Sequence, residues 1–135
     1  MPGLEVHLVT PEREVWSGEA DFVTARGVDG DLGVLPGHAP LLAALAVGPV
    51  FIDAGGSRTA VAVDGGFLHV AHEDDVTRVD ILAEHAVLPE ELGGGDDADA
   101  HERRAEELRS EDRLDEAREE RAKAATRRRV AENGR

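Results

Sequence analysis

The chain has 135 residues, carries a net charge of −14 at neutral pH and contains no cysteine. This acidic balance argues against non-specific binding of nucleic acid, which needs basic side chains to displace counterions. The lack of cysteine excludes disulfides and thiolate chemistry. Residues 1–10 do not form the continuous apolar run of a signal peptide, and no stretch approaches the ~20 apolar residues of a transmembrane helix.

Composition divides the chain into a folded body and a charged tail. Aliphatic residues are frequent up to Val87, whereas 26 of the last 48 residues are charged and none of them is aromatic. Only the first part can build a hydrophobic core. We therefore expect a β-sandwich domain over residues 1–88, a Gly/Asp-rich linker over 89–99 and a charged helical arm over 100–135. The acidic charge is spread over residues 1–120, and residues 121–135 are basic, with six basic and one acidic side chain.

The body shows the period-2 pattern of short strands separated by turns. Gly55-Gly56-Ser57 is a hairpin signal, and Asp64-Gly65-Gly66 predicts a tight corner that needs positive φ. Together these patterns predict an all-β sandwich of two sheets and about ten short strands. The predicted strands lie around Leu4–Leu8, Val15–Trp16, Ala20–Arg26, Pro49–Ala54, Arg58–Val63, Phe67–Ala71, Val76–Leu82 and Glu84–Leu88.

Between the third and fourth of these strands lies the most constrained stretch, Gly27 to Val50. It holds five of the fifteen glycines and three of the six prolines. Its prolines exclude a helix, and its leucines and valines favour burial. We expect a compact corner in which the loop from Asp29 to Pro40 is held in one shape. A rigid loop on a β scaffold is a common contact surface.

The tail has the composition of a helix. Strong helix formers run from Ala100 without proline or glycine until Gly134, and Asp97 or Asp99 can cap the start. The apolar stripe is thin, so the helix gains little from docking. A break near Asp112 would make a hairpin, and one long helix is the alternative. The same features suit a movable arm and a frayed tail.

No catalytic centre is apparent. The histidines are scattered or straddle the end of a strand, and no cysteine supports a structural zinc. Asp29-Gly30-Asp31 begins like a calcium loop but lacks the closing Glu. The glycine run of the linker lacks the lysine and the preceding strand of a phosphate-binding loop, and no serine has a nucleophile motif. We expect no metal and no cofactor, and a binding or regulatory subunit rather than an enzyme.

Several motifs occur in the order found in one known family. The stretch Asp31 to Leu41, Asp-Leu-Gly-Val-Leu-Pro-Gly-His-Ala-Pro-Leu, resembles the Gly-Glu-Leu/Ile-Gly-Ile-Leu-Pro-Gly-His-Ala-Pro-Leu signature of the ATP synthase epsilon subunit. The other matching elements are Leu4–Pro11, Val15-Trp16-Ser17-Gly18, Leu45–Val50, Val63–Val70 and Val76–His85. The resemblance therefore covers about residues 1–87.

The resemblance implies a β-sandwich with a C-terminal helical hairpin that serves as a non-catalytic rotor subunit of the F-type ATP synthase. Its implied partners are the gamma subunit, the c-ring and, through the arm, the alpha and beta subunits, and the arm can inhibit ATP hydrolysis. It also implies a peripheral place on the cytoplasmic face of the bacterial cell membrane. The alternative is a free-standing β-sandwich binding module or a small enzyme unrelated to ATP synthase.

Carried over to this chain, the resemblance indicates three sets of site residues. The loop with Asp31, Leu32, Pro36, Gly37 and His38 would face the c-ring, although His38 also suits a structural role in bracing the Pro36–Pro40 turn. The basic cluster of Arg127, Arg128 and Arg129 would meet a beta subunit. The ATP-binding motif of some bacterial members, Ile/Leu-Asp-x-x-Arg, occurs at Leu114–Arg118, later than in the family, so Asp115 and Arg118 are the candidates for regulatory ATP.

Overall fold

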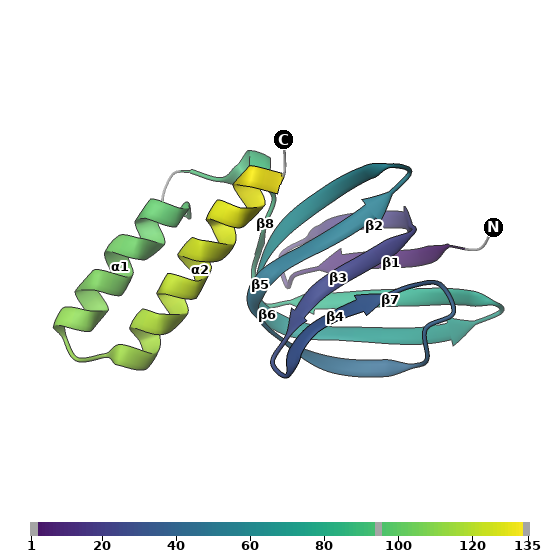
Figure 1. Ribbon diagram of the computed structural model, residues 1–135, viewed down its shortest axis with the longest axis horizontal. Helices are drawn as coiled ribbons and strands as arrows, with labels where there is room; N and C mark the ends of the chain where they lie inside the picture. Colours follow the sequence, from purple (N-terminus) through teal and green to yellow (C-terminus); the bar gives the residue numbers. More distant parts are fainter. Residues whose placement is uncertain (1–2, 94–95, 134–135) are drawn as a thin grey trace.

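A computed structural model describes residues 3–93 and 96–133 and contains, within them, eight strands, one 3-10 turn and two α-helices (Figure 1). The strands are β1 (Leu4–Val9), β2 (Glu14–Ala20), β3 (Phe22–Gly27), β4 (Gly30–Val34), β5 (Leu41–Ala54), β6 (Ser57–Glu73), β7 (Val76–Ala83) and β8 (Ala86–Val87). They are followed by the 3-10 turn η1 (Pro89–Glu91) and the helices α1 (Ala98–Ser110) and α2 (Leu114–Asn133).

The strands form two layers because β5 and β6 are long enough to take part in both. The hydrogen-bonded order is β2-β1-β7-β6-β5-β3-β4, with β8 paired to β6. The second half of β6 pairs with β7 and the first half with β8. We call β2, β1, β7 and the adjoining halves of β6 and β5 the first layer, and β4, β3, β8 and the other halves the second layer.

The bend in β6 occurs at its glycines. Gly65 has φ 91° and Gly66 has φ 132°, which are values that glycine adopts without steric cost. A Cβ built on Gly66 would lie 2.1 Å from the carbonyl oxygen of Leu82. The expected corner at residues 64–66 is thus a bend within one continuous strand, and the chain passes there from one layer to the other.

The predicted fold class, a β-sandwich followed by a helical hairpin, is confirmed. The strands are fewer and two are longer than the pattern suggested, with 14 residues in β5 and 17 in β6. The stretch expected as a loop from residue 29 to 40 contains β4, which pairs with β3, so only Asp29, in the β3–β4 turn, and Leu35–Pro40 lie outside a strand. A short edge strand tolerates the glycines at 30 and 33. In the sequence these glycines had been interpreted as turn residues, so the strand was not predicted.

The hydrophobic core lies between the two layers. Each strand supplies alternate residues to it, as in the buried positions of β1 and β7. Residues with no more than 1% exposure include Leu4, Val6, Leu8, Val23, Val34, Val50, Ile52, Val61, Val63, Leu68, Val70, Val79 and Ile81. Aliphatic residues of this size each contribute about 1.5–3 kcal/mol on burial, so the sandwich is the stable part of the molecule.

The tail is a hairpin rather than one long helix. Asp97 caps α1 by accepting a hydrogen bond from the Ala100 amide at 2.9 Å, and the helices part at Asp112, whose φ is 59°. Helix α2 lies between α1 and the strands β5 and β6, so α1 forms the outer edge of the molecule (Figure 1). Within the described residues, neither helix is long and apolar enough to cross a membrane.

Little apolar surface holds the hairpin to the sandwich. A small cluster of Phe51, Ala60, Ala62 and Val87 on the outer face of the second layer packs against Val130 of α2. The buried positions that join α1 to α2 are mostly alanines, including Ala105, Ala117 and Ala124. Because alanine buries little area, apolar packing alone is a weak attachment for a helical pair of this length.

Candidate functional site

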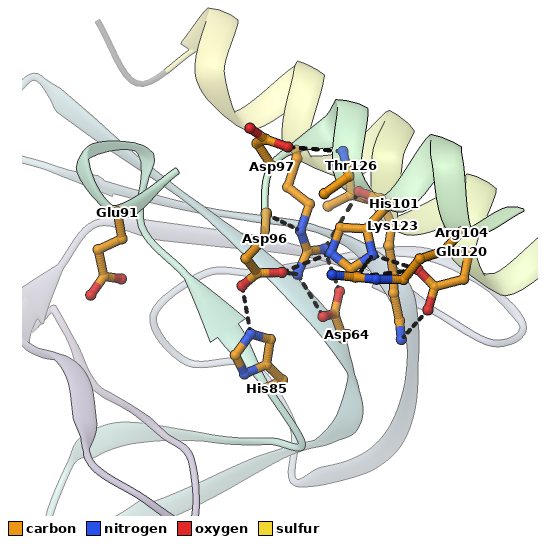
Figure 2. Close-up of polar contacts among 12 residues, drawn as sticks. Asp64, His85, Glu91, Asp96, Asp97, His101, Arg104, Glu120, Lys123 and Thr126 are labelled. Carbon is orange, nitrogen blue, oxygen red and sulfur yellow. Dashed lines mark hydrogen bonds and ion pairs between the residues drawn. The ribbon is translucent and has the colours of Figure 1, made fainter. Parts of the chain in front are cut away.

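A buried ion pair joins the arm to the sandwich. Arg127 of α2 is fully buried, and its Nη1 and Nη2 donate to the two carboxylate oxygens of Asp64 at 2.6 and 2.7 Å. Asp64 stands at the bend of β6, which directs its side chain toward the helix (Figure 2). A bidentate guanidinium–carboxylate contact is both strong and geometrically specific. The pair fixes where along the sandwich α2 docks.

The linker completes the same site through Asp96. The Asp96 carbonyl accepts from Arg127 Nε at 3.1 Å, and its carboxylate accepts from Arg127 Nη2 at 3.1 Å. The other carboxylate oxygen lies 2.8 Å from Nε2 of His85, which follows β7. Residues from the sandwich, the linker and α2 therefore meet at one point (Figure 2).

His101 extends this cluster into α1. Its ring is buried, with Nε2 at 2.7 Å from Asp96 and Nδ1 at 2.5 Å from Glu120 of α2. Arg104 Nη1 also lies 3.0 Å from Nδ1, but the carboxylate is the closer partner. Both carboxylate contacts are hydrogen bonds only when each ring nitrogen carries a proton. We call Asp64, His85, Asp96, His101, Glu120 and Arg127 the hinge cluster.

Two acidic members of the hinge cluster, Asp96 and Glu120, have a lowered pKa. Burial on its own raises the pKa of the Asp96 carboxyl, but hydrogen bonds from His85 and His101 and the charge of Arg127 outweigh it and lower the pKa to about 2. For Glu120, burial again opposes the hydrogen bond from His101 and the neighbouring Lys123, and its pKa is lowered. The charged carboxylates thus stabilise the docked arm.

The three predicted basic residues of α2 point in different directions, because successive residues on a helix are about 100° apart. Arg127 is buried against Asp64. Arg128 forms an ion pair with Glu102 of α1. The guanidinium of Arg129 lies 5.4 Å from the ring centroid of Phe51. In this docked arrangement Arg127 is inaccessible to a partner protein.

The residues predicted to face the c-ring fall in two places. Asp31 and Leu32 lie on β4, where Asp31 is exposed and pairs with Arg26 at 3.4 Å. Pro36, Gly37 and His38 lie in the loop after that strand. Asp31 is three residues before the end of β4, so it lies about 10 Å along the strand from the start of the loop.

The loop at residues 35–40 is tied to the first layer by hydrogen bonds. The Gly37 amide donates to Oγ1 of the buried Thr77 at 2.8 Å, and the carbonyl of His38 lies 3.0 Å from Nε2 of His72. The His38 ring itself is 2.7 Å from the Ala39 carbonyl, a local contact that fits the bracing role. The loop is thus anchored while Leu35 and Pro36 remain exposed.

The ATP-motif candidates open α2 at the far end of the hairpin. Leu114 is the first residue of the helix, and Asp115 and Arg118 are 3.9 Å apart and strongly exposed. Neither residue takes part in the hydrogen bonds that define the hinge cluster. Their role in binding ATP stays a prediction.

An apolar row crosses the outer face of the first layer. Cross-strand pairing places Ala44, Phe67, Leu82 and Val9 side by side on β5, β6, β7 and β1. Phe67 and Leu82 are each about half exposed, at 51% and 52%. The row borders a hollow of about 380 Å³ that also includes Pro11. Contiguous exposed apolar surfaces of this kind are common at protein interaction sites.

The hinge cluster was not apparent from the sequence. Asp64 was taken only as part of a corner, and His101 as one of several scattered histidines. Their partners are distant in the chain, since Asp64 and Arg127 are 63 residues apart, and no local spacing reports such a contact. Among the described residues no group of acidic and histidine side chains has the arrangement of a metal site.

A β-sandwich joined to a helical hairpin by a buried ion pair, with an exposed apolar row and an anchored loop, has the features of a binding subunit with a helical arm. The family model described as ATP synthase, Delta/Epsilon chain, beta-sandwich domain matches residues 3–89. The chain belongs to the ATP synthase epsilon chain family, whose members are non-catalytic subunits of the complex.

Relatives extend this likeness beyond the sandwich. The chain is 55% identical over 86 residues to the ATP synthase epsilon chain of Frankia casuarinae, covering 63% of this chain and 96% of that one. It is 42% identical over 120 residues to the epsilon chain of Halalkalibacterium halodurans, covering 89% and 83%. A chain of the Euglena gracilis mitochondrial ATP synthase structure, which comprises OSCP, F1 and the c-ring, matches with a TM-score of 0.69 at 26% identity, covering 98% of this chain and 79% of that one.

Proposed function

We propose that this chain links the gamma subunit to the c-ring in the rotor of a bacterial ATP synthase, on the cytoplasmic face of the cell membrane, and that its arm inhibits ATP hydrolysis when it leaves the sandwich. Membership of the epsilon family supports the place in the central stalk. The observation that carries the assignment of a partner surface is the apolar row on the first layer.

The apolar row is the surface that we assign to the gamma subunit. It lies on the face of the sandwich opposite the docked hairpin, so the arm can move without disturbing it. Phe67 and Leu82 are its centre, because they are neighbours across β6 and β7 and both project outward. Large apolar side chains at the centre of a contact supply most of its binding energy.

The test is a binding experiment with the gamma subunit. Phe67→Glu puts a charge at the centre of the row and is expected to weaken gamma binding by at least ~30-fold, which corresponds to about 2 kcal/mol. Val28→Glu is the matched control, because Val28 is also an exposed apolar residue but lies in the turn between β3 and β4. Equal binding by both variants would remove the row as the gamma surface.

We assign the c-ring contact to the anchored loop, with Pro36, Gly37 and His38, and to the β4 residues Asp31 and Leu32. The loop suits this role because its anchoring to Thr77 limits the ordering that a contact would require. Gly37 has φ 88°, so Gly37→Val strains the backbone and is expected to impair coupling. The measurement is ATP synthesis driven by proton flow in membranes that contain the variant.

The arm is suited to release because charged contacts, rather than a large apolar interface, hold it in place. Once α2 leaves, Arg127 becomes accessible, and its charge adds to those of Arg128 and Arg129 around the helix, which suits a contact with acidic segments of a beta subunit. Truncation after Leu92 removes the whole arm and is expected to raise ATP hydrolysis by the assembled complex. Unchanged hydrolysis would refute the inhibitory role and leave stalk assembly intact.

A further inference from the structure

The hollow beside the apolar row is built at the bend of β6. Phe67 and Leu82 line it from β6 and β7, and Val9 and Pro11 line it from the end of β1 and the segment that follows. Gly66 also lines it, with φ 132° and room for no side chain, because a Cβ there would lie 2.1 Å from the Leu82 carbonyl oxygen. The bend that carries β6 from one layer to the other therefore leaves a hollow on the outer face.

The walls of the hollow are held in place by hydrogen bonds. The Thr10 amide donates to the Arg13 carbonyl at 2.9 Å, and the Glu84 amide donates to the Gly65 carbonyl at 3.1 Å. The Arg13 side chain in turn pairs with Glu91 of η1 at 2.6 Å, which ties the segment after β1 to the end of the sandwich. A hollow that is formed before binding requires little further ordering when a partner enters it.

The lining is apolar except for one carboxylate. Among the described residues that line the hollow, Glu84 is the one charged side chain. Its carboxylate makes no hydrogen bond or ion pair within the described part of the chain, and Arg13, the basic residue of the segment after β1, is engaged by Glu91. An unpaired carboxylate next to an apolar hollow is complementary to a partner that brings a basic group beside an apolar one.

The size of the hollow suits a single projecting side chain. Its volume of about 380 Å³ is near the lower end of the range of about 300–1,000 Å³ that small-molecule sites occupy. A ring that enters it covers Phe67 and Leu82, which are about half exposed. Aromatic side chains that fill such pockets supply much of the binding energy of protein interfaces, and a ring can also pack edge-to-face on Phe67.

We propose that the gamma subunit inserts one aromatic side chain into this hollow and pairs a neighbouring basic residue with Glu84. This role of the hollow rests on the assignment of the apolar row to gamma, and it adds the chemistry that gamma must present there. The row alone would accept any flat apolar surface. The hollow selects a projecting ring, and Glu84 selects the charge beside it.

Indole is the probe for the hollow itself. In an amide NMR titration of the full chain, indole is expected to cause saturable shifts at Val9, Thr10, Gly66 and residues 82–84, which line the hollow. Val9→Trp fills the hollow from its own wall and is expected to abolish these shifts. Val28→Trp is the matched control, because it adds the same side chain in the turn between β3 and β4. The amide spectrum of each variant also confirms that it is folded.

Binding to the gamma subunit is then measured on the same proteins. Val9→Trp is expected to weaken binding by at least ~10-fold although it adds apolar area, because the hollow is already filled, whereas Val28→Trp is expected to bind like the parent. Saturating indole is expected to weaken gamma binding of the unmodified chain. Glu84→Gln is expected to weaken gamma binding by ~10-fold and to leave the indole shifts unchanged. Glu90→Gln is its control, because Glu90 is also exposed but lies in η1.

Three results would overturn the proposal. These are the absence of saturable indole shifts at the hollow, gamma binding by Val9→Trp that is as tight as that of the parent, and equal gamma binding by Glu84→Gln and Glu90→Gln. The second result would mean that the face is a flat contact. If Phe67→Glu weakens gamma binding and Val9→Trp does not, the gamma assignment stands and the insertion fails. If neither variant weakens it, both fail.

Discussion

Replacing Asp64 with asparagine is the change that probes the attachment of the arm most sharply. Asn has nearly the shape of Asp, so the bend of β6 and the packing around it are kept, while the negative charge that faces Arg127 is lost. Arg127 stays fully buried in the docked state. The variant thus asks how much the docked arm depends on one buried charge pair.

The structure sets the size of the effect. Removing one partner of a buried ion pair costs about 3–5 kcal/mol, since the remaining charge is left uncompensated. Asp96 still contacts Arg127 through its carbonyl and its carboxylate at 3.1 Å, so the low end of that range applies. A loss of about 3 kcal/mol shifts the docking equilibrium by about 150-fold toward release.

Spin labels at two exposed serines can measure this equilibrium. The chain has no cysteine, so Ser57→Cys at the start of β6 and Ser110→Cys at the end of α1 give specific labelling. A single interspin distance is expected for the parent protein, and a broad, longer distribution for Asp64→Asn. Arg128→Gln is the matched control, because its ion pair with Glu102 is exposed and such pairs contribute little.

An unchanged distance distribution in Asp64→Asn would refute this reasoning, because the buried pair would then not hold the arm. A loss of structure in the sandwich as well as the arm would show that Asp64 serves the fold rather than docking. The double change Asp64→Asn with Arg127→Met separates these cases. It removes both charges and is expected to restore part of the docking that the single change loses.

Two further predictions concern release of the arm in acid and the bend of β6. The pKa of Asp96 is lowered to about 2 from 3.8, so its contribution to the stability of the docked arm is full above about pH 5 and is lost as pH falls from about 4 to 2. After allowance for its partly exposed side chain, this contribution is about 1 kcal/mol. Amide exchange of α2 should show that acid release, and Asp96→Asn should flatten it, while an unaltered pH profile would contradict the assignment. Gly66→Ala brings a Cβ to 2.1 Å from a backbone oxygen and is expected to cost at least about 2 kcal/mol of unfolding free energy in urea titrations, whereas Gly56→Ala, with open space around it, should cost less.

Local patterns predict most of the sandwich because most of its strands, though not β4, carry their own signal. Alternation identifies β1 and β7, and the glycine pair at 55 and 56, both at positive φ, identifies the β5–β6 hairpin. The continuity of β6 was missed because Gly65 and Gly66 normally end a strand, whereas here they bend it. A turn residue does not reveal whether the chain reverses or only changes layer.

The hinge cluster could not be predicted, for a different reason. Arg127, Arg128 and Arg129 look like one basic patch in the sequence, but the helix turns them to a buried carboxylate, a neighbouring helix and an aromatic ring. No spacing motif in the sequence links Asp64, Asp96 and His101. Contacts between elements far apart in the chain depend on how the hairpin packs, which the thin apolar stripe of α2 does not specify.

ATP hydrolysis by a reconstituted complex tests most directly whether docking of the arm controls the enzyme. Four versions of this chain are compared: the parent, Asp64→Asn, the truncation after Leu92, and the truncation with Asp64→Asn. Hydrolysis is expected to fall in Asp64→Asn, because more arms are released, and to be high and equal in both truncated forms. Hydrolysis that is unchanged or higher in Asp64→Asn, or that still falls when the arm is absent, would contradict this account.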